Sequence, residues 1–461
     1  MPLKQAIFVL LLTTGLLGAP LVTSAAPLRI AAVGSIREMQ DLDGAANPVV
    51  EVLSYYADLN RGGGLFVWTA GASGAPDNCV TFAAQGKQAD AQKGRWVRRL
   101  SGALDATMCG AYWDNSHDDA AALTRAFAAA SALRVGLSLP GGAAKVCSSV
   151  KAARAVVVRG QGMGTQGDAA PSPTLVDGGC MKGGFVFEIA APNGTQALEA
   201  PKYYDMEIIP GRNNNPGGCI RWNNPANGFV DGPGSQYYMM HPHAERIYCN
   251  MAGNQQIGLE CSKCFDGDFS QNIIVTGKIG ISLEGSDVMC IGCAGPNRIS
   301  YCTDNLIRML SHGTFGNMDR VVGNELLYPT DNHQRYDSFI YDTARSSTIE
   351  SNHIEGIISG VQSVIHVVGG FSHTIANNDV AVLSELGALG PKAAPNWLVA
   401  EGPFVNFRAV NNGCTGCVLG PALFRNQSPN FNASGVRQII THEGNAVNGD
   451  VGFPFNSASP R

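Results

Sequence analysis

GAYWDNSHDDAAAL, residues 110–123, is the stretch of this chain that decides the fold. It leads from a polar loop into an alanine-rich apolar run that continues to Leu133. Asp118 and Asp119 stand just before that run, where a carboxylate can cap free N–H groups and favour the positive end of the helix dipole. We therefore predict one helix over residues 120–133, and we assign both aspartates to capping in preference to catalysis.

Two segments follow the predicted helix, LPGG at residues 139–142 and VVVRGQG at residues 156–162. Together with the opening stretch they resemble the start of right-handed parallel β-helix proteins of the pectate-lyase superfamily, where a similar segment leads into a short helix and a first strand. The resemblance implies a solenoid of short strands, with the helix laid across its open strand edge. It also implies that long acidic or neutral polysaccharides are the substrate class.

The later sequence repeats irregularly every 22 to 34 residues, as in a solenoid. One register marks strand starts that must stack in parallel to bury a face: Gly258-Leu259, Gly280-Ile281, Leu306-Ile307, Phe339-Ile340, Val364-Ile365 and Trp397-Leu398. A second register is an asparagine that we interpret as a turn ladder, because its amide can bond to stacked copies of itself: Asn324, Asn352, Asn378, Asn412 and Asn445. We expect about ten coils between Lys145 and Gly449.

These patterns predict an all-β protein made of a right-handed, single-stranded parallel β-helix over residues 108–455, with an N-terminal capping helix. Residues 44–100 form a separate small β-rich head module, with LSYY at 53–56, GGGLFVW at 62–68 and GRWVRR at 94–99. This module resembles the head that precedes many β-helix domains in phage tailspikes and bacterial secreted proteins. By that analogy alone, the chain is expected to form a homotrimer.

The first 26 residues have the pattern of a secretory signal peptide, with Lys4, an apolar run and a small-residue stretch at 23–26. No later segment is apolar for long enough to span a membrane. The formal charge of −5, with 15% charged residues, gives no basic surface for nucleic acid. We expect a secreted or periplasmic protein whose partner is a polysaccharide.

The thirteen cysteines include three C-x-x-C pairs, which begin at Cys261, Cys290 and Cys414. Two such pairs can hold zinc, but an oxidising compartment favours disulfides or buried thiols. The first two pairs start about one coil apart, so they could also be stacked cysteines of neighbouring coils. An odd total leaves at least one thiol without an intramolecular partner.

Catalytic aspartates of the polygalacturonase branch, to which the resemblance extends, lie just before strands of this kind on adjacent coils. The equivalent position here holds Gln256, Lys278, Asp304 and Asp337. Stacked strands lie about 4.8 Å apart, so Asp304 and Asp337 are predicted to form an acid and base pair for hydrolysis. Residues 302–305, CTDN, resemble one motif of that branch, whereas its companion motifs are absent, and both aspartates could simply cap turns.

A second cluster would suit β-elimination, which needs a base and a cation to hold charge at a uronate carboxyl. Its candidate catalytic residues are Lys278, His333, Arg335 and Tyr336. The predicted substrate-binding residues are His312, Tyr341, Arg308 and Gln256. Residues 237–246, YYMMHPHAER, combine aromatic rings for sugar stacking with two histidines and an acid, a spacing that a metal site also uses.

The sequence thus predicts a carbohydrate-active enzyme that cleaves glycosidic bonds of a polysaccharide, with hydrolysis slightly preferred. The alternatives are a polysaccharide lyase that acts on a uronate-containing glycan and a non-catalytic glycan-binding or envelope protein. No cofactor or metal is expected for hydrolysis, and a Ca²⁺ ion would enter only with the lyase alternative.

Overall fold

The computed structural model describes most of the residues from Ile30 onward. They are residues 30–85, 94–153, 155–164, 173–189, 198–212, 215–222, 239–251, 255–311, 316–327, 338–356, 363–382, 396–415, 424–425, 439–443, 445–447 and 450–451. The predicted signal peptide, residues 1–26, lies outside them. No helix in the described part of the chain has the length and apolar character needed to cross a bilayer.

The N-terminal head is a small sheet with its own apolar core. Its strands pair in the order β1-β2-β3-β5-β4, and Val50, Phe66 and Trp96 are fully buried between them and the helix α1. The elements are β1 (Ala31–Ser35), α1 (Ile36–Gln40), β2 (Val49–Ser54), β3 (Gly62–Ala70), β4 (Thr81–Phe82) and β5 (Gly94–Arg98). The division of the chain at residues 44–100 and 108–455 stays a prediction.

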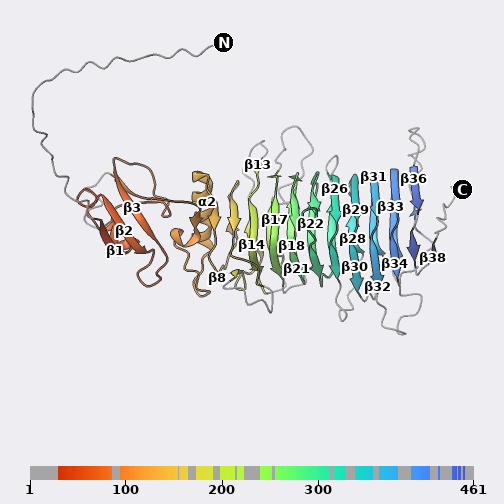
Figure 1. Cartoon of the computed structure of the whole chain (residues 1–461), viewed down its shortest axis with the longest axis horizontal. Coiled ribbons are helices and arrows are strands. Elements are labelled where there is room, and N and C mark those ends of the chain that lie inside the picture. The colour runs from red at the N-terminus through yellow and green to blue at the C-terminus, as the bar shows by residue number, and fades with distance from the viewer. Residues whose placement is uncertain are drawn as a thin grey trace, which may run out of the picture.

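The rest of the described chain winds into a parallel β-helix, which confirms the predicted fold (Figure 1). Between the head and the coil lie β6 (Leu104–Asp105), η2 (Ala106–Cys109), α2 (Ala120–Leu133) and β7 (Leu137–Ser138). Every strand pair of the large sheet is parallel except that between β37 and β38. Each coil contributes strands to three faces, which we name A, B and C.

Face A follows β6 and β7. It consists of β10 (Val157–Arg159), the first halves of β14 (Lys202–Ile209) and β17 (His243–Asn250), β20 (Asp268–Ser270), β23 (Cys290–Ile291), β26 (Asn317–Val322), β29 (Ser346–Glu350), the second halves of β31 (Ser363–Ala376) and β33 (Asn396–Val410), and β36 (Ile439–Glu443).

Face B consists of β8 (Gly142–Lys145), β11 (Thr174–Asp177), the second halves of β14 and β17, β21 (Ile273–Val275), β24 (Arg298–Ser300), β27 (Glu325–Leu327), β30 (His353–Gly356), β32 (Asp379–Val382), β34 (Gly413–Thr415) and β37 (Ala446–Val447), with β38 (Asp450–Val451) folded back on the last.

Face C consists of β9 (Val150–Lys151), β12 (Gly184–Glu188), β15 (Gly217–Trp222), β18 (Gln256–Ser262), β22 (Ile279–Glu284), β25 (Asn305–Leu310), β28 (Ser338–Asp342), the first halves of β31 and β33, and β35 (Phe424–Arg425). A three-stranded sheet of β13 (Leu198–Glu199), β16 (Met239–Met240) and β19 (Cys264–Phe265) covers the corner between faces C and A.

The predicted strand register is the register of face C. Leu259 pairs with Ile281, and Ile281 pairs with Ile307. The same column continues through Ile340, Ile365 and Leu398 on the next three strands. These side chains are fully buried, because each inward position repeats an apolar residue that covers the one in the coil before it.

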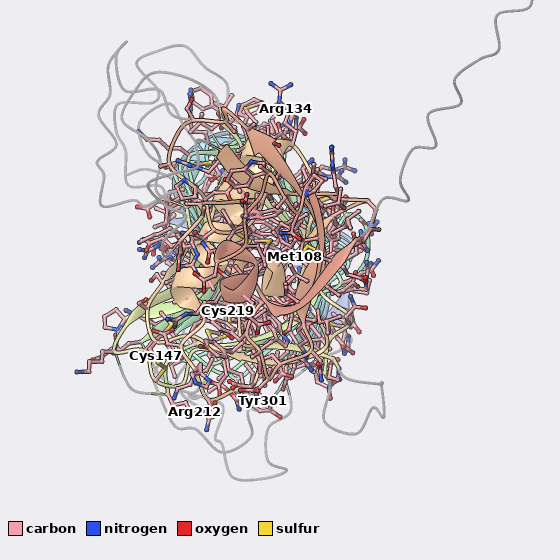
Figure 2. The ribbon with its side chains drawn as sticks, turned by 90° about the vertical axis from the view of Figure 1, so that its left-hand side faces the viewer. Met108, Arg134, Cys147, Arg212, Cys219 and Tyr301 are labelled. Carbon is pink, nitrogen blue, oxygen red and sulfur yellow. A yellow bond between two sulfur atoms is a disulfide. The ribbon has the colours of Figure 1, made fainter. Side chains whose placement is uncertain are left out.

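The helix α2 lies between the head and the first coils, where it covers the open end of the solenoid (Figure 1). Leu123 and Phe127 on its inner side are fully buried. The Phe127 ring lies 5.9 Å from Phe187 and 6.3 Å from Tyr203, centroid to centroid. Figure 2 looks along the coil from this end and shows Met108 near the middle of the cross-section, with Arg134 and Arg212 at its rim. The helix thus seals the apolar interior.

The two aspartates before α2 have different roles, although the sequence predicts a helix cap at both. Asp118 caps the helix, since its Oδ1 accepts hydrogen bonds from the N–H of Ala120 at 3.1 Å and of Cys147 at 3.0 Å. Asp119 makes no side-chain cap. Its buried carboxylate instead accepts from the backbone N–H of Tyr112 at 2.7 Å and Trp113 at 3.0 Å, which fixes the preceding loop.

The asparagine ladder is present at the corner between faces A and B, and it is longer than predicted. Each side-chain amide donates to the Oδ1 of the next copy at 2.8 to 3.0 Å, in the order Asn272, Asn297, Asn324, Asn352, Asn378, Asn412 and Asn445. The turn at this corner has left-handed backbone at the residues just before the asparagines, such as Gly323, Ser351 and Asn377.

Most cysteines of the described chain are oxidised, as predicted. The disulfides are Cys79–Cys109, Cys147–Cys180, Cys219–Cys249, Cys261–Cys264 and Cys290–Cys293, and Cys414 is also disulfide-bonded. The prediction that the first two C-x-x-C motifs stack in neighbouring coils is wrong. In the strand register Cys261 lies beside Leu283 on face C, whereas Cys290 lies beside Asp268 on face A. Cys302 is a free, buried thiol.

Candidate functional site

A column of polar side chains runs across five consecutive strands of face A. Lys202 pairs with His243, and His243 pairs with Asp268. Asp268 in turn pairs with Cys290, and Cys290 pairs with Arg320. Adjacent strands are about 4.8 Å apart, so register alone brings these residues together although 118 positions separate the first from the last.

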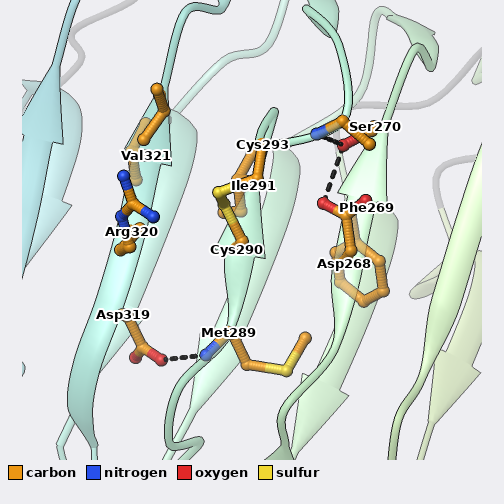
Figure 3. Close-up of a disulfide and its surroundings, with 12 residues drawn as sticks. Asp268, Phe269, Ser270, Met289, Cys290, Ile291, Cys293, Asp319, Arg320 and Val321 are labelled. Atoms are coloured by element: carbon orange, nitrogen blue, oxygen red, sulfur yellow. Dashed lines mark hydrogen bonds between the residues drawn. A yellow bond between two sulfur atoms is a disulfide. The ribbon is translucent and has the colours of Figure 1, made fainter.

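The column lines an open groove of about 450 Å³. Its walls also include Tyr204, His241, Asp266, Met318 and the disulfide between Cys290 and Cys293. Figure 3 shows the disulfide between Arg320 on one side and Asp268 on the other. The side chain of Met318 is exposed, because its backbone has a positive φ of 60° at the start of β26. Apolar and charged groups therefore share the surface that a ligand would meet.

Asp268 is a carboxyl group that lines this groove. Partial burial raises the pKa of its carboxyl above the ordinary value, whereas the hydrogen bond from Ser270 and the nearby His243 lower it. The Ser270 hydroxyl lies 2.7 Å from Asp268 Oδ1 (Figure 3). A carboxyl with a raised pKa keeps its proton to higher pH, which is the property that a general acid needs.

His243 is a second titratable group that lines the same groove. Burial lowers the pKa of its imidazole, and the positive charges of Lys202 and Arg246 lower it further, against the opposing effect of Asp268. Its ring lies 4.9 Å from the ring of Tyr204, centroid to centroid. The imidazole is therefore expected to be largely neutral at neutral pH, and a neutral imidazole can accept a proton.

Contacts between polar and charged side chains continue from His243 to neighbouring residues of face A. His243 Nε2 lies 3.1 Å from Glu245 Oε2, and Glu245 also contacts the guanidinium of Arg246. Arg246 and Arg159 both bind Asp205, the latter at 2.9 Å. Glu245 is thus held by His243 and Arg246.

The arrangement can support acid and base chemistry on one bound ligand. Asp268 and Glu245 lie on adjacent strands and two positions apart in register. Strand geometry places the Cα atoms of such residues about 8 Å apart. Carboxyl groups of inverting glycosidases lie about 6.5 to 9.5 Å apart, which leaves room for a water molecule beside the sugar.

Not all of the residues predicted to form a column before the face C strands have exposed side chains. The backbone bonds link Gln256, Lys278 and Asp304 in adjacent coils. Lys278 Nζ lies 3.5 Å from Asp304 Oδ2, and both side chains are partly exposed, 37% and 45%. Gln256 is only 2% exposed and its amide donates to the carbonyl of Gly211, so it does not present a group to a ligand on the surface.

The other predicted residues divide between face C and the part of the chain outside the described residues. Arg308 and Tyr341 are register partners on β25 and β28 and face outward. Five predicted residues lie outside the described residues: His312, His333, Arg335, Tyr336 and Asp337. The pairing of Asp304 with Asp337 and the elimination cluster around His333 stay predictions.

The histidine-rich segment before β17 contributes to the groove through its side chains. His241 Nδ1 lies 3.0 Å from Glu199 Oε2, and its Nε2 lies 3.5 Å from Asp266 Oδ2. Within the described ranges, no group of three or more His, Cys, Asp or Glu side chains has a geometry that could hold a metal ion. His241 and His243 therefore act as polar groups of the groove.

Sequence reasoning found one side of this groove and missed the other. It singled out the segment that contains His241, His243 and Glu245, but not Tyr204, Asp268 or Arg320. The steps along the column vary, with 41 residues from Lys202 to His243, 25 to Asp268, 22 to Cys290 and 30 to Arg320. The signal that the sequence offers is the short apolar strand that recurs at each step. Because the steps differ in length, a search for a fixed repeat length does not detect it.

Comparison with known proteins supports the two-part architecture. The family described as "Phage tail protein small four-stranded beta-sheet domain" matches residues 32–101, which is the head. No curated protein matches the chain.

Solved structures that resemble the chain include several phage tailspikes. Tailspike protein 2 of Escherichia coli O157:H7 bacteriophage CAB120 has 13% identity and a TM-score of 0.55, with 91% of this chain and 51% of that chain covered. A tailspike of Acinetobacter phage vb_AbaP_AS12 has 8% identity and a TM-score of 0.59, with 94% and 78% covered.

A third structure is the tailspike of Acinetobacter baumannii bacteriophage Fri1, described as a capsular polysaccharide depolymerase, with 10% identity and a TM-score of 0.53 over 92% of this chain and 76% of that chain. This chain thus spans about half the length of the CAB120 tailspike and about three quarters of the other two. At these identities the similarity shows a shared parallel β-helix fold.

Proposed function

We propose that the protein binds a polysaccharide in the groove of face A and cleaves its glycosidic bonds by hydrolysis. The observation that carries this proposal is the pairing of Asp268, whose pKa burial raises, with the neighbouring His243 and the carboxylate of Glu245. Asp268 protonates the leaving oxygen, and Glu245 accepts a proton from the attacking water. The capsular polysaccharide depolymerase among the similar structures makes capsule-type polysaccharides the first substrates to test.

The assignment is tested with the full chain and a panel of capsular and plant acidic polysaccharides, with new reducing ends as the readout. Asp268→Asn should lower kcat by at least about 100-fold, because a general acid contributes about 10² to 10⁴ in rate. Asp379→Asn is the matched control, since Asp379 is 74% exposed on face B. Full activity in the Asp268 variant would remove the proposal.

The stereochemistry of the product gives a second check. If Asp268 and Glu245 act across the expected 8 Å, water attacks directly and the anomeric configuration inverts. Proton NMR of the first product formed should show the opposite anomer to that of the substrate linkage. Retention of configuration would contradict the role of Glu245 as base.

Asp304 and Asp337 remain a competing assignment for the same reaction. The Asp304→Asn variant, measured beside Asp268→Asn, distinguishes the two. If Asp304 is the acid, its variant loses activity and the Asp268 variant keeps it. We expect the reverse, because Asp304 lies exposed beside Lys278 and outside the groove.

β-Elimination is the second candidate, and the state of His243 favours it. A neutral imidazole between Lys202 and Asp268, with Arg320 in the same column, could remove a proton next to a uronate carboxyl while the cations hold its charge. Elimination leaves an unsaturated uronide that absorbs in the ultraviolet, whereas hydrolysis does not. Absorbance measured during digestion therefore separates the reactions.

Export and assembly belong to the same proposal. A secreted or periplasmic enzyme would meet polysaccharide outside the cytoplasm, and the disulfides of the coil are compatible with an oxidising compartment. By analogy with tailspikes we propose a homotrimer. Light scattering on the purified protein should then give three times the mass of the chain.

A further inference from the structure

Face C carries a second outward column of polar side chains, separate from the groove of face A. Its members are register partners on seven consecutive strands: Glu188, Arg221, Glu260, Ser282, Arg308, Tyr341 and His366. Hydrolysis as proposed above uses none of them. The charge distribution along this column changes at Ser282.

The charged side chains in the first half of the column, from Glu188 to Glu260, neutralise one another through ion pairs. Arg221 lies between two carboxylates, with Nη1 at 3.6 Å from Glu188 and Nε at 2.5 Å from Glu260. Lys151 Nζ binds the other side of Glu188 at 2.9 Å. The guanidinium of Arg221 also stacks 4.0 Å from the ring of Phe185. These groups satisfy one another and leave little charge for a ligand.

The second half of the column presents the cation Arg308 and the rings of Tyr341 and His366 instead. Arg308 binds only the Ser282 hydroxyl, through Nε at 3.3 Å and Nη2 at 3.1 Å, and within the described chain no carboxylate forms an ion pair with it. Ser282 is fully buried, so this contact fixes the direction of the guanidinium.

Tyr341 and His366 continue the column beyond Arg308. Their rings pack edge to face with centroids 5.3 Å apart. His366 Nε2 is buried without a hydrogen-bond partner and lies 3.6 Å from Glu401, the one acid that forms an ion pair with it in the described residues. At two strand spacings, the row from Arg308 to His366 is about 10 Å long.

We propose that Arg308, Tyr341 and His366 form a binding site for the acidic sugar residues of an anionic polysaccharide. A guanidinium recognises a sugar carboxylate through two parallel hydrogen bonds, which a buried Ser282 contact has already oriented. The Tyr341 ring supplies an apolar surface for the face of a sugar, and its edge-to-face contact with His366 holds that ring in place. The site holds the polymer independently of cleavage on face A.

The experiment measures binding of the intact protein to polygalacturonate, alginate and hyaluronate, with neutral dextran for comparison, by isothermal titration calorimetry at low and at moderate salt. At least one acidic polymer should bind, and its affinity should fall as salt rises. Arg308→Gln should weaken that binding by about 10- to 100-fold, as expected for a charge-assisted hydrogen bond. Arg308→Lys, which keeps the charge but loses the fork, should recover only part of it.

Arg298→Gln is the matched control, because Arg298 is an exposed cation of face B paired with Glu325. It should leave the affinity unchanged, and a thermal melt of each variant separates lost binding from lost folding. Wild-type protein that binds none of the acidic polymers, or an Arg308→Gln variant with wild-type affinity and melting temperature, overturns the inference.

The outcome is independent of the proposed enzyme. Asp268→Asn should bind the acidic polymer with wild-type affinity at the face C site while it loses cleavage. If wild type binds in an Arg308-dependent way but cleaves nothing, the binding site stands and the proposed hydrolysis fails. If cleavage depends on Asp268 but affinity does not depend on Arg308, the proposed hydrolysis stands and the binding site on face C fails.

Discussion

His243 and Asp268 lie directly opposite each other on adjacent strands of face A. Burial moves both groups toward their neutral forms, since it lowers the pKa of the imidazole and raises the pKa of the carboxyl. Each group opposes this effect in the other, because Asp268 raises the pKa of the imidazole and His243 lowers the pKa of the carboxyl. This pairing is the reason that we propose a reaction centre in the groove of face A.

The first prediction concerns the pH dependence of cleavage. A general acid must be protonated, so activity should decline as pH rises through the raised pKa of Asp268. The variant Asp268→Asn should lose this alkaline decline together with most of its rate. Initial rates between pH 4 and pH 9 measure both effects. A residual activity that declines with the same profile as wild type would exclude Asp268 as the acid.

The second prediction concerns the asparagine ladder. The Asn352 amide donates to Val321 O at 3.0 Å and to Asn378 Oδ1 at 2.9 Å, and its own Oδ1 accepts from the backbone and side chain of Asn324. Asn352→Ala leaves several buried groups unpaired, at about 1 to 3 kcal/mol each. Urea unfolding should show a loss of at least about 2 kcal/mol.

The neighbouring Asn377 provides the control for that measurement. It is exposed and has a φ of 55°, so glycine can take its backbone conformation without strain. Asn377→Gly should change the free energy of unfolding by less than about 1 kcal/mol. Equal losses in the two variants would mean that the ladder adds nothing specific.

The sequence was sufficient for the features that repeat along the chain. The face C column from Leu259 to Leu398 and the ladder asparagines each need the same residue type at the same place in every coil, so both leave a periodic signal. The helix over residues 120–133 was predicted with its bounds, because a cap and an apolar run define it locally.

The candidate site was only partly predictable, because its residues do not repeat. Lys202, His243, Asp268 and Arg320 share one column but differ in type, and connections of unequal length separate them. The sequence also does not show whether a side chain just before a strand is buried or exposed. Gln256 and Asp304 have equivalent sequence positions, yet Gln256 is buried with its amide on the carbonyl of Gly211, whereas Asp304 is exposed beside Lys278.

The third prediction concerns the junction between the head and the coil. The buried Arg98 donates to the carbonyls of Gly63, Cys79, Gly62 and Met108, and its guanidinium lies 4.5 Å from the Phe66 ring. Arg98→Ala leaves these carbonyls without their donor and removes the packing. The free energy of unfolding should therefore fall by about 3 kcal/mol or more.

The exposed neighbour Arg99 is the control for Arg98. Arg99→Ala should change stability by less than about 0.5 kcal/mol, as surface substitutions usually do. Differential scanning calorimetry can also show whether the head unfolds separately in the Arg98 variant. A single unchanged transition in that variant would mean that the head does not depend on this residue.

The fourth prediction compares two disulfides. Cys147–Cys180 closes a loop of 33 residues between neighbouring coils, whereas Cys290–Cys293 closes a loop of three beside the groove. Chain entropy predicts losses of about 4 and about 2 kcal/mol respectively when each pair is replaced by serine. The second pair should affect KM more than stability, because Cys290 and Cys293 line the groove. Equal KM values in both double variants would contradict that role.

The last prediction concerns Asp319, which is buried inside the coil on β26 and accepts a hydrogen bond from the N–H of Met289 at 3.0 Å (Figure 3). Burial raises the pKa of its carboxyl well above the ordinary value, and the nearby Asp342 and Asp287 raise it further. The native state therefore holds this proton more tightly than the unfolded chain does. The stability that the group contributes is fully present below about pH 3.9, the unfolded value, and declines as pH rises toward the raised pKa.

Asp319→Asn keeps the oxygen that accepts from Met289 and removes the cost of ionising the carboxyl. Near pH 4 the variant and wild type should have similar free energies of unfolding. At pH 8 the variant should be the more stable by more than about 1 kcal/mol, since each unit of pKa shift corresponds to about 1.4 kcal/mol. Urea titrations at the two pH values measure the difference directly. A variant that is less stable than wild type at pH 8 would mean that Asp319 is ionised in the folded protein and that a cation inside the coil compensates its charge.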